Sequence, residues 1–168
     1  MMAEAGVMNL DFSPVIGNIL DTVETEMPWL ARLPEEIITG KQNKQNRTVK
    51  QLLGHLVDSA SNNHQRIVRM QYNETLEFPD YTQDNDRWIA VQDYQHANWK
   101  NLLGLWKYYN LHLAHLIGCV GPEKSKNRWT DYEGNEITLQ QMIEGYVWHL
   151  HLHLGEIHEL LNGNNNEK

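Results

Sequence analysis

Apolar residues recur every three to four positions over most of this 168-residue chain, and that spacing strongly limits its fold. Side chains at this period share one face of an α-helix. Four segments show the pattern, at about 12–33, 48–72, 97–119 and 138–162. The sequence therefore predicts an all-α protein, a four-helix bundle that buries the four apolar faces. The length predicts one domain, 1–168.

Signals for helix starts and stops divide the chain in the same way. The pair Ser13–Pro14 predicts an N-cap followed by a proline in the first helical turn, and Pro34 ends that helix. The segments Thr48–Gln51 and Thr138–Gln141 have the residue types of a capping box. Each of them is therefore expected to open a helix.

Three connections lack the helical period. The polar stretch 39–47 is predicted to be a loop, and 129–138 a short hairpin that turns at 133–135. The segment 73–94 is predicted to be a long irregular crossover between the second and third helices. Loops of this length in compact domains are often functional.

The charge and the cysteine content limit which binding partners and which cellular compartment are expected. Fourteen basic and twenty-two acidic residues leave a net charge of -8, whereas a nucleic-acid surface normally carries a basic stripe. The one cysteine, Cys119, excludes an internal disulfide and is predicted to be a buried, inert thiol. Neither a secretion signal nor an apolar run of membrane-spanning length is visible. We therefore expect a cytoplasmic protein that binds neither nucleic acid nor membranes.

The pair His149 and His153 in the fourth helical segment is the strongest chemical signal. Four residues apart on a helix, their rings share one face and can bind one divalent cation, as the histidines of H-E-x-x-H do. The stripe that contains them borders the apolar face of the helix. The alternative is that both are hydrogen-bonded core residues.

A third ligand has to come from another helix. His55 borders the apolar face of the second helix and can reach a bundle interior, whereas His64, nine residues on, points about 180° away. His112 and His115 in the third helix could contribute, but no carboxylate lies near them in the sequence, so core or surface roles are expected.

Two segments, Gly54–Arg66 and Tyr146–Ile157, together resemble the DinB-like superfamily, and the resemblance extends over essentially the whole chain, including Phe78–Tyr81. In that family a four-helix bundle holds one divalent metal ion through a histidine on helix two and an H-x-x-x-H pair on helix four. The resemblance implies the metal ligands His55, His149 and His153. Zinc is the expected ion, although nickel, iron and manganese accept the same donors.

Three histidines leave coordination positions open, which is typical of catalytic rather than structural metal sites. The resemblance implies either metal-dependent hydrolysis of a small molecule or transfer with a low-molecular-weight thiol. Asp58, Asn62, Arg66 and Glu156 are predicted to orient ligands or substrate, or to be ordinary polar residues of the bundle. Glu156 could contact a metal ligand, carry a proton or simply be solvated. The alternative function is a non-catalytic metal-binding or interaction domain.

Association is the last expectation from the sequence. Six tryptophans are more than one small core is expected to hold, although packing within the monomer is the alternative. Relatives that the chain resembles are often dimeric. We therefore expect a homodimer.

Overall fold

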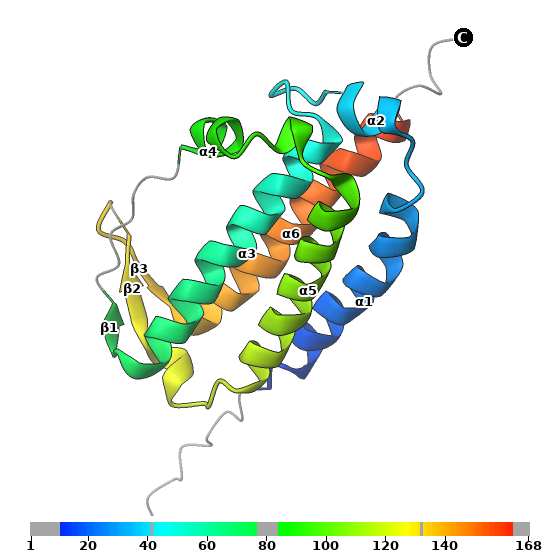
Figure 1. Cartoon of the computed structure of the whole chain (residues 1–168). Coiled ribbons are helices and arrows are strands. Elements are labelled where there is room, and N and C mark those ends of the chain that lie inside the picture. Colours follow the sequence, from blue (N-terminus) through cyan, green and yellow to red (C-terminus); the bar gives the residue numbers. More distant parts are fainter. Residues whose placement is uncertain (1–10, 41, 77–83, 132, 163–168) are drawn as a thin grey trace, which may run out of the picture.

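The computed structural model describes residues 11–40, 42–76, 84–131 and 133–162. Four long helices, α1 (Ser13–Leu30), α3 (Val49–Tyr72), α5 (Trp99–Gly118) and α6 (Leu139–Asn162), form the body of the molecule (Figure 1). The shorter elements are α2 (Glu35–Gly40), α4 (Asn85–Val91), the 3-10 turns η1 (Tyr94–His96) and η2 (Lys124–Lys126), and the strands β1 (Thr75–Leu76), β2 (Arg128–Thr130) and β3 (Glu136–Thr138). The predicted all-α four-helix bundle is confirmed.

The order of the helices around the bundle does not follow the chain. Both α1 and α3 pack against α5 and α6, so α1 lies diagonally opposite α3 and α5 diagonally opposite α6. In Figure 1, α3 and α5 run in the same direction. The chain must therefore return along the bundle between them, which confirms the predicted long crossover. Part of that crossover is regular, because it contains β1, α4 and η1. Phe78–Tyr81 lies outside the described residues.

A small sheet closes one end of the bundle, at the start of α6 (Figure 1). Strands β2 and β3 pair antiparallel, with Trp129 opposite Ile137, and this confirms the predicted hairpin. Strand β1, at the start of the crossover, pairs with β2 in parallel, so residues from before and after α5 meet here. The sequence did not predict β1, because two residues are too few to show an alternating pattern.

The helix starts agree with the sequence in most places. The Thr48 hydroxyl accepts from the Gln51 amide and the Gln51 side chain accepts in return from the Thr48 amide, which confirms the capping box. The same reciprocal bonds join Thr138 and Gln141. The Ser13 prediction is wrong: Ser13 is inside α1, and its backbone amide is capped by the Asp11 carboxylate instead. The predicted loop at 39–47 is partly wrong, since α2 extends to Gly40.

Two expectations about side-chain burial are corrected. Cys119 is exposed, because it follows the last turn of α5 instead of lying on its apolar face. Most tryptophans pack within the monomer: Trp106 and Trp129 are buried, Trp29, Trp88 and Trp99 are half-buried, and Trp148 is exposed. The number of tryptophans therefore gives little support to a dimer. Within the described residues, no helix is long and apolar enough to cross a membrane.

The η1 turn is attached to α3 through a close contact that only glycine permits. A Cβ atom on Gly54 would overlap the ring of Tyr94, whose hydroxyl donates to the buried Asp58 carboxylate at 2.6 Å. We expect Gly54→Ala to lower the free energy of unfolding by about 1–3 kcal/mol, as overpacking does. The control Gly104→Ala, in α5, meets no atom within 4 Å and should be stabilising by up to about 1 kcal/mol. Urea unfolding of both variants checks this, and equal effects would contradict it.

Candidate metal centre

Three histidine rings from two helices converge between α3 and α6. The Nε2 atom of His149 lies 3.2 Å from Nε2 of His55 and 3.1 Å from Nε2 of His153. His55 comes from the middle of α3 and is 3% exposed, and the other two are half-buried on α6. The four-residue spacing on α6 places its two rings side by side, and the packing of α3 on α6 adds the third. The sequence-predicted ligands are therefore brought together.

This arrangement fits a bound metal ion. Ligand nitrogens about 2.0–2.1 Å from a tetrahedral zinc ion are separated by about 3.3–3.4 Å, slightly more than the Nε2 distances here. Burial, and then the neighbouring histidines, lower the pKa of His55 to about 3. Burial and His153 lower the pKa of His149 to about 4. Both rings are thus neutral near pH 7, as metal ligands must be.

The other ring nitrogens are held by polar neighbours. Nδ1 of His149 lies 3.2 Å from the Ser59 hydroxyl on α3, and Nδ1 of His153 lies 3.1 Å from the Glu156 carboxylate. The Asn43 side chain donates to the same carboxylate oxygen at 3.1 Å. With the ring proton on Nδ1 and donated outward, each Nε2 keeps its lone pair toward the centre. Metal-binding histidines are commonly oriented by such contacts.

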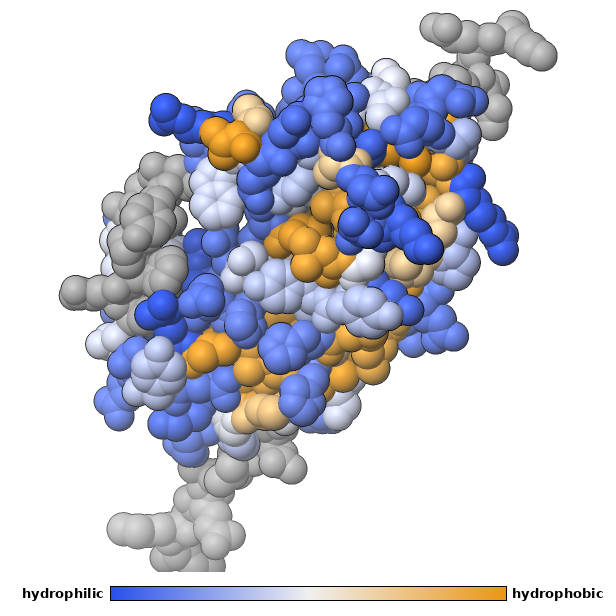
Figure 2. All heavy atoms as spheres, viewed as in Figure 1, coloured by the Kyte–Doolittle hydropathy of each residue, from blue (hydrophilic) through white to orange (hydrophobic). Residues whose placement is uncertain are grey.

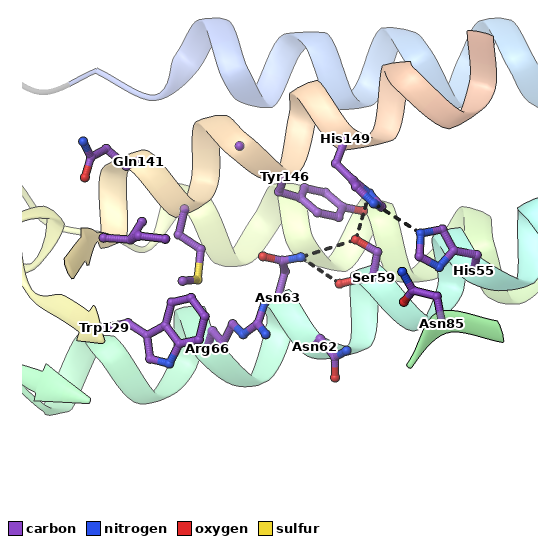
Figure 3. A pocket seen from close by; sticks show the side chains of 13 residues that line it. His55, Ser59, Asn62, Asn63, Arg66, Asn85, Trp129, Gln141, Tyr146 and His149 are labelled. Carbon is purple, nitrogen blue, oxygen red and sulfur yellow. Dashed lines mark hydrogen bonds between the residues drawn. The ribbon is translucent and has the colours of Figure 1, made fainter. Parts of the chain in front are cut away.

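A cavity of about 340 Å³ opens beside the centre and reaches His55 and His149 (Figure 3). Its polar wall comes from α3, through Ser59, Asn62, Asn63 and Arg66. The Arg66 guanidinium stacks 4.5 Å from the ring centre of Trp129. The opposite wall comes mainly from α6, through Gln141, Met142, Gly145 and Tyr146, with Ile137 from β3, whereas Asn85 from α4 lies beside His55 (Figure 3). A small substrate could therefore contact the centre and these polar side chains at once.

The four predicted catalytic residues fall into two groups. Asn62 and Arg66 line the cavity. Asp58 does not: it is buried under η1, where Tyr94 and Gln92 donate to it, and burial raises its pKa. Glu156 lies on the far side of the histidines, in a separate groove beside Asn43. The structure therefore separates side chains that could touch a substrate from those that hold neighbouring parts of the site.

Several lining residues were not assigned a role from the sequence. Ser59 and Asn63 lie on α3 in helical spacing with His55 and Asn62, so the period of that helix could have indicated them. Trp129 had no such signal. It lies on β2, which is placed by its pairing with β1 at the start of the crossover and with β3 before α6.

Comparison with known proteins supports the same fold. No protein-family model matches the chain. A solved structure of YfiT from Bacillus subtilis, described as "a probable metal-dependent hydrolase with an unusual four-helix bundle topology", superimposes with a TM-score of 0.77. The match covers 95% of this chain and 88% of that one at 21% identity. This chain has the YfiT fold. The bundle with α1 opposite α3 and α5 opposite α6 is thus shared with a solved protein.

The sequence comparison finds the same relative. The curated protein named "Putative metal-dependent hydrolase YfiT", from Bacillus subtilis (strain 168), is 29% identical over 114 residues. Those residues are 67% of this chain and 63% of YfiT, so the match spans a little less than two thirds of the relative. Both comparisons find YfiT, a four-helix bundle described as a metal-dependent hydrolase, and this agrees with the predicted resemblance to the DinB-like superfamily. The three-histidine group and the metal-dependent relative both indicate a metal ion.

Proposed function

We propose that this protein is a metal-dependent hydrolase that acts on a small polar molecule. The observation that carries the proposal is the convergence of three histidine Nε2 atoms at the end of a cavity. A divalent ion bound there, with zinc expected, supplies Lewis-acid activation of a water molecule. The name of the curated relative favours hydrolysis over other metal-dependent reactions.

The residues around the centre have different roles in this proposal. Ser59 and Glu156 fix the ring orientation of His149 and His153, so that the ligands are in place before an ion binds. Asn62 and Arg66 bind and orient the substrate from the α3 wall, and Trp129 holds the guanidinium by stacking. Asp58 acts indirectly, by anchoring Tyr94 and with it the end of the crossover.

Two other functions use the same centre. A low-molecular-weight thiol could take the open coordination position and be transferred to a substrate, as the family resemblance implies. A non-catalytic metal-binding domain would need only the three ligands. Among the described residues, the group of histidine, cysteine and acidic side chains close enough to share an ion contains these three histidines and no fourth member. An open position beside a cavity favours an enzyme over a closed structural site.

Metal analysis followed by activity screening tests the proposal. Purified protein without a histidine tag is assayed for zinc, nickel, iron and manganese, and the loaded form is screened against ester and amide substrates. Metal-dependent hydrolysis supports the proposal. Turnover only with added thiols indicates the transferase alternative, and a metal-loaded protein inactive in both screens indicates the non-catalytic one.

Glu156 is expected to act on metal affinity more than on chemistry. Because its carboxylate contacts His153 and faces away from the cavity, Glu156→Gln should weaken metal binding by about 10–100-fold. The turnover number of the metal-saturated variant should change little. Metal titration and kcat at saturating metal separate the two effects. A loss of about 10²–10⁴-fold in kcat with metal retained would instead show that Glu156 carries a proton.

We also propose that the protein forms a homodimer through the outer face of α6. Trp148 and Leu152 lie one turn apart on that face and are 66% and 43% exposed. Burying them against a second copy would remove apolar surface from water. Light scattering should give twice the chain mass of 19.7 kDa, and Trp148→Ser should shift the value toward the monomer. A wild-type monomer at micromolar concentration would rule the dimer out.

A further inference from the structure

The cavity beside the metal centre differs in charge from the molecule as a whole. The chain has a net charge of -8, and polar side chains cover much of the face shown in Figure 2. Among the described residues that line the cavity, by contrast, no side chain is acidic, and Arg66 is the one that is charged at neutral pH. A divalent ion at the histidines would add further positive charge to the same cavity.

Two carboxylates that are close to the metal ligands in the sequence do not offset this charge. Asp58 follows His55 by three residues, but it is buried beneath η1, where Tyr94 donates to it at 2.6 Å. Glu156 follows His153 by three residues and lines a separate groove. The cavity is therefore a positively charged pocket in an acidic protein, and such a pocket attracts anions.

The Arg66 guanidinium is held in place on the cavity wall. It stacks on Trp129 at 4.5 Å from the ring centre, and Arg66 is half-buried. Figure 3 shows Arg66 between Trp129 and Asn63, farther along α3 than His55. Stacking engages the flat face of a guanidinium, whereas carboxylate and phosphate oxygens bind at its edge through paired N–H donors. The contact with Trp129 is therefore compatible with the binding of an anion.

The positions of Arg66 and the histidines along α3 set the length of a molecule that could reach both. Ser59, which contacts His149 at 3.2 Å, marks the level of the metal centre on this helix. Arg66 lies seven residues farther on, about 10 Å along the helix axis. Helical side chains lean toward the N-terminus of their helix, which brings the guanidinium closer to the histidines. A small molecule in the cavity of about 340 Å³ could therefore contact both.

We propose that the substrate of this site carries an oxyanion, a carboxylate or a phosphate group, which Arg66 binds while the bond to be hydrolysed lies at the metal centre. This assignment rests on the proposed function, because the cavity is then the substrate site of that hydrolase. Charge-assisted bonds to a guanidinium are about twice as strong as bonds between neutral groups. An otherwise identical neutral molecule should therefore bind more weakly, so the site selects its substrate by charge.

Calorimetric titration of chelator-treated wild type tests the anion site apart from the metal ion, which could itself bind a carboxylate. The probes are N-acetyl-4-aminobutyrate, its neutral carboxamide and N-acetyl-O-phosphoethanolamine. At least one anion should bind about 10–100-fold more tightly than the carboxamide, and the tighter anion identifies the group. Arg66→Gln should abolish this preference. Arg66→Lys, which keeps the charge but not the paired donors, should keep part of it.

Arg69→Gln is the matched control, because it removes the same charge from the exposed face of α3. It should keep the full preference. The melting temperature of each metal-free variant checks folding, and the comparison of anion with carboxamide in wild type needs no variant. Equal binding of the anions and the carboxamide by wild type, no binding of either, or a preference that survives in folded Arg66→Gln would overturn the anion site.

The hydrolase is tested separately, with zinc-loaded protein and paired esters that do or do not carry the oxyanion. Arg66→Gln should raise KM for the anionic ester by about 10–100-fold and leave KM for the neutral ester unchanged. Anion binding through Arg66 without any hydrolysis would contradict only the proposed hydrolase. Hydrolysis of both esters by wild type with equal KM would contradict only the anion site.

Discussion

Replacing His149 or His153 by alanine should reduce bound metal at the main centre to a small fraction of one ion per chain and abolish metal-dependent activity. Each change removes one of three converging nitrogens. The bundle should stay folded, because its stability comes mainly from a core in which residues such as Leu52, Trp106 and Ile143 are fully buried. Metal analysis and far-UV circular dichroism of the two variants check both halves of this prediction.

His151→Ala is the matched control, because it lies on the same helix between the two ligands. Its ring is exposed and contacts the side chain of Asn18 on α1, away from the centre. It should keep full metal content at the main centre and full activity. Full occupancy of that centre in both ligand variants would remove His149 and His153 as ligands. Unfolding of both would show that the histidines support the bundle itself.

The metal-free protein should lose stability steeply as the pH falls from about 6.5 toward 4. The folded-state pKa is about 3 for His55 and about 4 for His149, both below the ordinary value of 6.5. In this window the unfolded chain therefore binds more protons than the folded chain. The free energy of unfolding consequently decreases as the pH decreases. At pH 5, which is 1.5 units below the unfolded pKa, each histidine contributes a loss of about 2 kcal/mol. Above pH 7 this contribution vanishes.

Urea unfolding of the chelator-treated protein at several pH values measures this slope. His55→Gln removes one of the two titrating rings and should flatten the slope by about half over the same window. His96→Ala, at an exposed position, should leave the slope unchanged. A free energy of unfolding that is constant from pH 7 to 5 in wild type would contradict the burial of neutral histidines. Metal affinity should also decrease as the pH decreases, because protonated imidazole cannot bind an ion.

The sequence determined the features that depend on local spacing. Apolar residues at the helical period predicted all four long helices, and Thr48 and Thr138 marked two of their starts within a residue. The pair His149 and His153 was also readable, because residues four apart on a helix share a face whatever surrounds them. His55 could be proposed from its position beside an apolar stripe, and the family resemblance selected it. These inferences needed no knowledge of how the helices pack.

The tertiary structure decided which side chains meet across helices. Asp58 and Asn62 are four residues apart on α3, yet Asp58 is buried beneath Tyr94 and Asn62 lines the cavity. Trp129 lines the cavity because its strand β2 pairs with β1, more than fifty residues earlier in the chain. Periodicity fixes the face of a helix on which a residue lies, whereas the partner of that face depends on long-range packing that local sequence does not encode.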